Sequence, residues 1–250
     1  MSYIFNTFFY DPLYNGLILL LSWLPSPEVG VAVILFTIIV KLILFPLSKQ
    51  AVHTQMKLRQ VEPELAKLRD RNKDDKEKQA REMMAFYKDN GINPFSGFFL
   101  LLLQIPVILA LYFIFFNGGL PIVDMERLYT FVAKAFATIT EPINMHFLGL
   151  DISRPQFILA LLAGISQYAQ VYYSVPPYVK VEKPTFKDDM MRSMNIQIRY
   201  VLPVFIFIIS LNISGAVALY WITSNLFTIA QELYMRKTIK KEPTVLAPKA

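Results

Sequence analysis

The chain of 250 residues contains no cysteine, and it is poor in charge. The absence of cysteine excludes disulfide bonds, thiolate metal sites, a thiol nucleophile and a lipid-modified N-terminal cysteine. Charged residues make up 18% of the chain and hydrophobic residues 54%, against about 25% and roughly 45–50% in soluble domains. The apolar residues form long uncharged blocks. Such blocks are typical of bilayer spans, because hydrocarbon penalises both charge and unpaired backbone groups.

Histidine is nearly absent as well, and so are the short motifs of common enzymes. His53 and His146 are the two histidines, and the topology derived below places them on opposite sides of the membrane. No H-E-x-x-H, G-x-S-x-G or P-loop pattern occurs. We therefore expect no metal, no cofactor, no nucleotide hydrolysis and no enzymatic activity.

Residues 1–28 carry no Lys or Arg and are predicted to form an extracytoplasmic segment. Their apolar run, 17–24, has no basic residue before it and no small-x-small site after it, so we expect no cleavable signal peptide. The run is too short to span a bilayer. We predict instead a helix over 11–24 that lies along the membrane interface, anchored by Tyr14 and Trp23.

Four apolar blocks predict five membrane spans. The segments 29–48, 95–116 and 155–175 each have the length of one span. The last block, 200–230, would be about 46 Å long as one helix, well beyond a hydrocarbon core of about 30 Å. The turn-prone segment 212–215 lies near its middle. We therefore predict two short helices there, at 196–212 and 214–235.

The distribution of Lys and Arg predicts the orientation of the chain. The segments 49–94, 176–199 and 231–250 hold 21 of the 25 Lys and Arg residues. Five spans place these segments on one side, and basic loops stay in the cytoplasm. The N-terminus is therefore predicted outside and the C-terminus inside. The net charge of +6 reflects these loops and does not call for DNA as a partner.

Residues 50–90 are predicted to form a cytoplasmic helical hairpin. Apolar residues recur at spacings of three and four on both arms: Leu58, Val61, Leu65 and Leu68, then Ala80, Met83, Met84 and Tyr87. A solvated helical linker is the alternative. Met56, Met83 and Met84 predict an adaptable surface for cytoplasmic contact with substrates, although methionines in a helix seam also serve simple packing.

Two further basic segments complete the cytoplasmic side, a loop at 176–195 and a tail at 236–250. The tail is attracted both to anionic lipid and to ribosomal RNA, so the ribosome is a candidate partner. Attraction to lipid explains the tail without any partner.

Lys41 stands out as the only ionisable residue that we place inside a predicted span. A charge at mid-membrane costs on the order of 3 kcal/mol, which favours a functional role. Snorkelling is the competing interpretation, because Lys41 lies only about 9 Å along the helix from Leu47, and its flexible stem could reach the headgroups.

The other spans are rich in uncharged polar residues: Gln104, Gln167, Gln170, Thr223, Ser224, Asn225 and Thr228, with Tyr220 and Trp221 beside the last group. Hydrogen bonds between helices explain many of them. A shared, water-filled concavity that opens to the cytoplasm would explain them together with Lys41.

Four segments carry a family resemblance: 37–50 (TIIVKLILFPLSKQ), 82–88 (EMMAFYK) with 93–94 (NP), 104–112 (QIPVILALY) and 218–231 (ALYWITSNLFTIAQ). In order and spacing they resemble the YidC/Oxa family of membrane protein insertases, over roughly residues 10–235. The resemblance implies an all-α integral membrane protein of the bacterial cytoplasmic membrane. It implies a five-helix transmembrane core at 29–235, a cytoplasmic helical hairpin and an N-terminal interfacial helix. We expect a bacterial-type member without the large extracytoplasmic domain, since about 28 residues precede the first predicted span.

The resemblance further implies a hydrophilic groove that is open to cytoplasm and lipid. A hydrophilic substrate segment would enter it while the apolar segment moves into lipid. The implied groove residues are Lys41, Gln104, Gln167, Gln170, Tyr220, Trp221 and Asn225. Lys41 stands where the family usually has arginine, which keeps the charge but loses the planar fork for carboxylates.

The implied partners are newly made membrane proteins and lipid, with a Sec-type translocon as a further candidate. The main alternative function is a small-solute transporter or channel that uses the same intramembrane polar residues. Against it, the sequence shows no inverted repeat and no matching pair of interrupted spans.

Overall fold

The computed structural model describes residues 3–72, 75–93, 96–116, 120–175 and 192–239. These residues are mainly helical, as an all-α membrane protein requires. The chain divides into two compact units. Unit 1 comprises residues 1–43 and 104–229, and unit 2 comprises residues 44–103 and 230–250.

Unit 1 contains the longer apolar helices. The chain enters through α1 (Tyr3–Phe5), the π-helical η1 (Asn6–Tyr10) and α2 (Asp11–Trp23), followed by α3 (Val29–Ile43). The unit also holds α6 (Ser96–Phe116) from residue 104 and α8 (Phe157–Ser174). A helix over Arg192–Ser210 follows, made in part of η3 (Gln197–Val201) and α10 (Leu202–Ser210). The last helix is α11 (Gly215–Ile239), which belongs to unit 1 up to residue 229.

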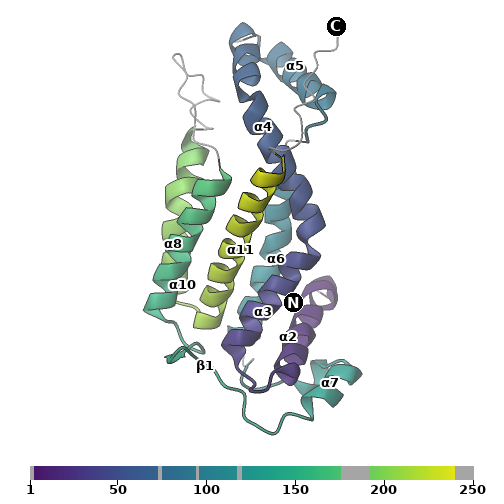
Figure 1. Ribbon diagram of the computed structural model, residues 1–250, viewed down its shortest axis with the longest axis vertical. Helices are drawn as coiled ribbons and strands as arrows, with labels where there is room; N and C mark the ends of the chain where they lie inside the picture. The colour runs from purple at the N-terminus through teal and green to yellow at the C-terminus, as the bar shows by residue number, and fades with distance from the viewer. Residues whose placement is uncertain (1–2, 73–74, 94–95, 117–119, 176–191, 240–250) are drawn as a thin grey trace. The chain divides into compact units, whose positions relative to one another are not determined.

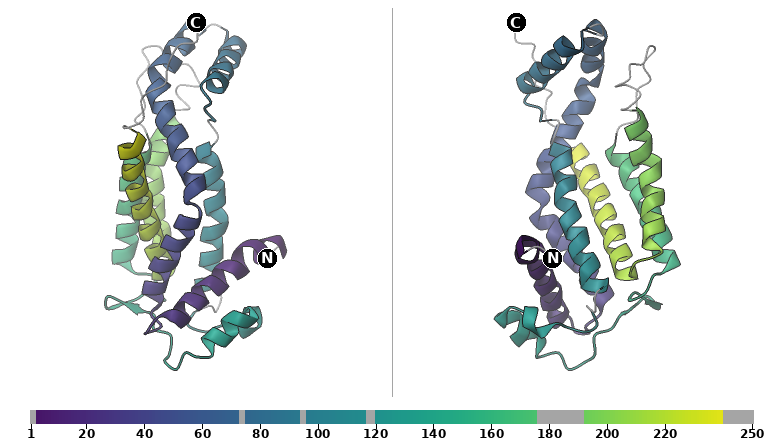
Figure 2. Two further views of the ribbon diagram at one scale, coloured as in Figure 1. Left: turned by 45° about the vertical axis from the view of Figure 1, so that its right-hand side comes forward. Right: turned by 180° about the vertical axis from the view of Figure 1, so that it is seen from behind.

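Within unit 1, α11 lies between the α8–α10 pair and the helices α3 and α6 (Figures 1 and 2). A single buried cluster joins these helices, with members that include Leu17, Val33, Leu111, Leu159 and Val217. The helices α8 and α10 pack closely, because α8 presents small residues to its neighbour. A methyl group on Gly164 would lie 3.0 Å from Cβ of Phe207. Small residues allow such close helix packing, the main source of helix association in lipid.

The segment between α6 and α8 folds into short local elements that contact the starts of α3 and α11. It contains η2 (Met125–Arg127), α7 (Thr130–Phe136), and the antiparallel pair β1 (His146–Phe147) and β2 (Leu150–Asp151). The two-residue turn of this hairpin has positive φ at Leu148 (49°) and Gly149 (80°), as a type I′ turn requires. We call residues 144–154 the β-strap.

The β-strap is hydrogen-bonded to the start of two helices. The N–H of Val29 donates to the carbonyl of Asn144 at 2.9 Å, which fastens the strap to α3. The N–H groups of Gly215 and Ala216 donate to the carbonyls of Arg154 (2.9 Å) and Ile152 (3.1 Å). Because the first N–H groups of a helix have no partner within it, the strap satisfies donors of α3 and α11 that would otherwise be unpaired.

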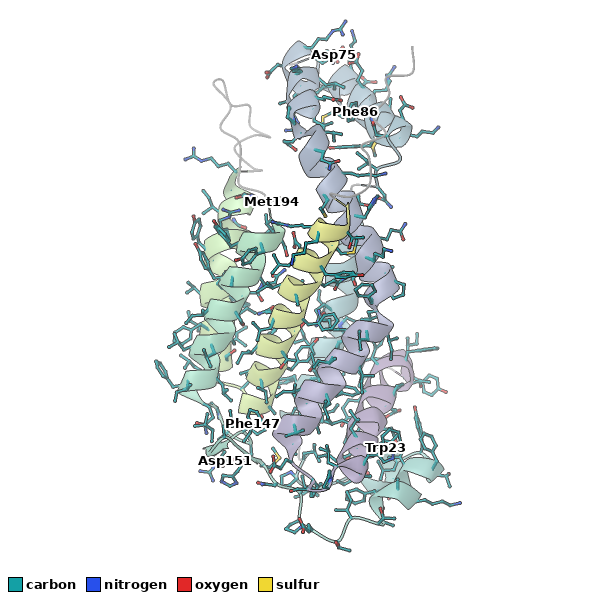
Figure 3. All side chains as sticks on the ribbon, viewed as in Figure 1. Trp23, Asp75, Phe86, Phe147, Asp151 and Met194 are labelled. Carbon is teal, nitrogen blue, oxygen red and sulfur yellow. The ribbon has the colours of Figure 1, made fainter. Side chains whose placement is uncertain are left out.

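Tyr14 does not anchor α2 at an interface, and that prediction is wrong. Its side chain is 1% exposed and belongs to the core of unit 1. Its hydroxyl accepts the N–H of Asp124 at 2.7 Å, so the polar end is satisfied inside the protein. Trp23, labelled in Figure 3, is exposed at the end of α2, and its anchoring at an interface stays a prediction.

Unit 2 contains two long polar helices, α4 (Phe45–Arg71) and α5 (Lys76–Asp89), with the first part of α6 and the last part of α11. A small apolar cluster joins α4 to the return arm: Val61, Leu65 and Ile92, with Leu58, Phe86 and Tyr87 against them. Near the connection the contacts are polar. The amide of Asn72 donates to Glu82 at 2.5 Å, and the amide of Gln79 donates to the carbonyl of Arg69 at 2.8 Å. Asp75 (Figure 3) caps α5 by accepting the N–H of Lys78.

The predicted seam of the return arm is partly wrong. On α4 the predicted Val61 and Leu65 are buried, whereas on α5 both Ala80 and Met84 are exposed. The residues that face α4 are Gln79, Met83, Phe86 and Tyr87, spaced by four, three and one, which is one face of a helix. The apolar pattern alone does not identify this face, because its first residue is the polar Gln79.

The first predicted span, 29–48, is interrupted. The helix α3 ends at Ile43, and α4 begins at Phe45 with Pro46 in its first turn. Proline lacks the N–H that would continue the ladder of α3 and is tolerated at a helix start, which explains a break at this position.

Length and composition alone identify fewer spans than we predict. Among the described residues, the helix Arg192–Ser210 is long and apolar enough to cross a membrane, and Val29–Ile43 with Phe45–Leu58 passes the same test as one interrupted span. The helices α8 and α11 fall short because polar residues such as Gln167, Gln170 and Asn225 lower their mean hydropathy. Five spans therefore stay a prediction. Most of the predicted loop 176–195 and tail 236–250 lies outside the described residues.

Candidate functional site

Lys41 points toward α11. Its ammonium Nζ lies 3.4 Å from Oγ1 of Thr228, and the side chain is half-buried. The hydroxyl of Thr228 donates its proton to the carbonyl of Ser224 at 2.8 Å. Its oxygen therefore acts as the acceptor for Lys41. Within the part of the chain that the structure describes, no carboxylate forms an ion pair with Lys41. The cation thus has a neutral partner and unused hydrogen-bond donors.

A second polar contact joins α11 to α6. The amide of Gln104 donates to the hydroxyl of Tyr220, which is 3% exposed. Because a buried phenol without a partner is costly, this bond fixes the two helices side by side at that level. Two of the predicted groove residues are therefore brought into direct contact.

A third contact joins α11 to α8. The amide of Asn225 donates to the hydroxyl of Ser166 at 3.1 Å, with both side chains buried. Along α8 the polar chain continues from Gln167 to Gln170 at 3.2 Å, and from Gln170 to Ser174 at 3.0 Å. Polar side chains on α11 thus contact α3, α6 and α8 in turn.

Burial separates the predicted groove residues into two groups. Gln167, Tyr220, Trp221 and Asn225 are buried, with exposed fractions of 9%, 3%, 8% and 7%. In this conformation they face neighbouring helices rather than solvent. Lys41, Gln104 and Gln170 are half-buried and keep accessible surface. Hydrogen bonding between helices, the simpler of our two interpretations, describes Tyr220 and Asn225. Gln167 instead bonds to Gln170 on its own helix.

Thr223 differs from Thr228 although both lie on α11. Its hydroxyl donates to the carbonyl of Leu219 at 2.8 Å, which is the same bond within the helix that Thr228 makes. Among the described residues, its side chain has no hydrogen bond to another helix. Thr223 is therefore outside the polar contacts of the candidate site.

The three methionines of the predicted cytoplasmic surface also differ in their surroundings. Met83 is buried in unit 2, so it serves packing, whereas Met84 is 54% exposed and Met56 is half-buried. Only Met84 presents most of its side chain to the surroundings. Contact between these methionines and substrates stays a prediction.

Our statement that Lys41 is the only ionisable residue inside a span is wrong, because Arg199 lies within the predicted span 196–212 and Glu232 within the predicted span 214–235. The side chain of Glu232 is 1% exposed, and Arg236 donates to its carboxylate at 2.9 Å. Beside it in unit 2, the amide of Gln231 donates to the hydroxyl of Ser48 at 2.6 Å. The spacing of four between Glu232 and Arg236 was the available signal, since such residues are neighbours on a helix.

An open pocket of about 510 Å³ lies in unit 1, lined by residues of the β-strap and by Ser26, Pro121 and Glu141. It is separate from the residues around Lys41. In the described ranges, no group of three His, Asp or Glu side chains is arranged to hold a metal ion.

Comparisons with a family model and with individual proteins point to the same family. Residues 21–242 match the model of the family described as 60Kd inner membrane protein. A Wolinella succinogenes protein named Membrane protein insertase YidC is 31% identical over 251 residues, covering all of this chain and 41% of that protein. Proteins of the same name from Marinomonas sp. and Clostridium tetani are 33% and 29% identical, over 85% and 87% of this chain. The alignments cover 33% and 86% of those two proteins, so the chain spans well under half of the first two relatives and most of the third.

Proposed function

We propose that this chain, which belongs to the 60Kd inner membrane protein family, is a membrane protein insertase. It moves short hydrophilic segments of substrate proteins into a hydrated groove and releases their apolar segments to lipid, without nucleotide hydrolysis. The observation that carries this proposal is Lys41, a half-buried cation on an apolar helix whose described partner is a neutral hydroxyl. Such a cation is available to attract an acidic segment of another protein.

The proposed topology has five spans, with the N-terminus outside and the C-terminus inside. The boundaries of α6, α8, the helix 192–210 and α11 support the predicted spans after the first. The excess of Lys and Arg in the segments before, between and after them supports the orientation. In this topology α4 and α5 form the hairpin in the cytoplasm, the insertase core covers 29–235, and the residues before it are extracytoplasmic.

The proposed groove is lined by the half-buried residues Lys41, Gln104 and Gln170. The buried Gln167, Tyr220, Trp221 and Asn225 form its wall. Within this wall, Tyr220 links α11 to α6 and Asn225 links α11 to α8. A wall whose polar groups are already paired with one another exposes few unpaired groups to a passing substrate. The substrate then encounters the positive charge of Lys41, with the amide groups of Gln104 and Gln170 as the other half-buried lining residues.

Two physical effects lower the barrier in this mechanism. A hydrated groove shortens the dry path for a hydrophilic segment, because it replaces hydrocarbon with water and paired polar groups. Polar residues at the ends of helix 192–210 and of α11, such as Arg192 and Arg236, shorten the apolar parts of these helices and thereby thin the bilayer locally. A membrane potential that is positive outside adds roughly 2.3 kcal/mol per 100 mV for each acidic charge that crosses.

The proposed partners are newly made membrane proteins and lipid. The basic tail 236–250 supports anionic lipid and the ribosome as additional partners on the cytoplasmic side. A Sec-type translocon is proposed only as a neighbouring machine that delivers substrates.

The test replaces Lys41 and measures insertion. Lys41→Ala and Lys41→Arg are assayed in proteoliposomes with a single-span substrate whose translocated tail is acidic. We expect Lys41→Ala to lose most insertion of this substrate and Lys41→Arg to retain it, because arginine keeps the charge. Lys49→Ala, which removes an exposed Lys on α4, is the matched control and should insert normally. Normal insertion by Lys41→Ala would exclude the charge from the mechanism.

The groove itself is tested by thiol labelling, which the cysteine-free chain makes simple. Single cysteines at positions 41, 104 and 170 should react with an aqueous reagent added from inside and not from outside. A cysteine at 221 should react slowly, because Trp221 is buried. Labelling from neither side at the first three positions would contradict a hydrated groove.

A further inference from the structure

We infer that Thr228 is a positioning residue that holds the Lys41 ammonium toward the groove and thereby sets the preference for acidic substrate segments. This inference rests on the proposed function. It starts from the 3.4 Å contact between Nζ of Lys41 and Oγ1 of Thr228, which joins residues 187 positions apart in the sequence.

The chemistry of the Thr228 hydroxyl makes it an acceptor. Its single proton is donated to the carbonyl of Ser224 at 2.8 Å, one turn earlier on α11. The oxygen lone pairs that remain can receive only a donor, and the ammonium of Lys41 is the donor in place. The bond within α11 therefore orients the hydroxyl for Lys41 rather than for an anion.

The contact holds Lys41 without neutralising it. An ammonium has three N–H donors, and a neutral hydroxyl occupies one of them. A contact of 3.4 Å to a neutral oxygen is long, so it competes weakly with a carboxylate. Thr228 thus directs the flexible lysine stem toward α11 and away from the headgroups, while leaving the charge available to an acidic side chain.

The experiment compares two substrates that differ only in charge. A single-span substrate carries two aspartates in its translocated tail, and its matched partner carries two asparagines. Insertion into proteoliposomes is measured for both, and the ratio of acidic to neutral insertion reports the charge preference. A purely structural role of Thr228 would lower both rates together and leave the ratio unchanged.

Thr228→Val keeps the shape of the side chain and removes the hydroxyl. We expect it to lower the ratio about twofold, the effect of a hydrogen bond at the weak end of the ordinary range, with neutral insertion unchanged. Thr228→Ser should keep the ratio of the wild type, and Thr223→Val is the matched control on the same helix. Thr228→Ala is interpreted in the same way if the valine variant does not fold.

The variant Lys41→Met, which removes the charge, distinguishes a failure of this inference from a failure of the proposed function. If Lys41→Met loses the ratio and Thr228→Val and Thr228→Ala keep it, positioning by Thr228 is refuted and the proposed function stands. An equal loss of both substrates in the Thr228 variants also refutes positioning. If Lys41→Met keeps the ratio, the charge has no role, and the proposed function fails first.

Discussion

Gly30 of α3 packs against Phe147 of the β-strap, and Gly30→Ala tests that packing. The added methyl group would lie 2.4 Å from Cγ and Cδ2 of Phe147 and 2.6 Å from its Cβ. Carbon atoms in contact normally lie about 3.5–4.0 Å apart. Phe147 (Figure 3) cannot relieve this overlap by a ring rotation alone, because its Cβ is attached directly to the strap backbone.

The expected net effect is a destabilisation of about 1–2 kcal/mol. Overpacking of this kind costs typically about 1–3 kcal/mol. Replacing glycine by alanine inside a helix regains at most about 1 kcal/mol, and less here because Gly30 is the second residue of α3. Thermal unfolding in detergent micelles, followed by tryptophan fluorescence, should show a Tm lowered by roughly 2–8 °C.

The control is the double variant Gly30→Ala with Phe147→Ala. Removing the phenyl ring makes room for the new methyl group, so the two losses should not add, and the coupling should exceed about 0.5 kcal/mol. A Gly30→Ala variant as stable as the wild type would show that β1 does not pack against α3 as described. Additive losses in the double variant would contradict the specific contact with Phe147.

Two further predictions concern polar contacts of unit 1. Tyr14→Phe removes the hydroxyl that accepts the N–H of Asp124 and should lower the free energy of unfolding by about 0.5–1.5 kcal/mol; an unchanged Tm would contradict the 2.7 Å bond. The Ser153 hydroxyl, which donates to Asp151 at 2.5 Å, holds the pKa of the Asp151 carboxyl below its ordinary value. The stability from a lowered pKa is present above the ordinary pKa of aspartate, about 3.9, and is lost as the pH falls through the lower folded pKa. Asp151→Asn should therefore lower Tm at pH 7 and flatten its decline in acid, and parallel pH profiles of Tm for the two proteins would contradict this.

The polar residues of the helices show why a site is harder to predict than a fold. The sequence indicated that Gln104, Tyr220 and Asn225 are polar residues in apolar helices, and two explanations stayed open. The structure pairs Gln104 with Tyr220, and Asn225 with Ser166. Which partner a side chain finds depends on helix rotation and neighbour choice, and neither leaves a pattern along the chain.

The hairpin of unit 2 shows the same limit on a smaller scale. A stripe of leucine and valine predicted the packed face of α4 correctly. Val61 and Leu65 are apolar, and on a helix they can leave water only by packing against a second segment. The apolar stripe predicted for α5 is turned about the helix axis from the face that packs on α4. The observed face begins with Gln79, a polar residue that an apolar pattern does not include. Exposed Met84 follows directly from that rotation.

The helical character of the chain, the approximate limits of its apolar helices and the turn between α10 and α11 follow from local sequence, because long uncharged runs can satisfy their backbone in lipid only as helices. Charge distribution along the chain carries the predicted orientation for the same local reason. The burial of Tyr14, the strap across the ends of α3 and α11, and the contact of Lys41 with Thr228 were decided by tertiary structure alone. Each depends on residues that are far apart in sequence, and only packing determines which of many compatible polar partners becomes the neighbour.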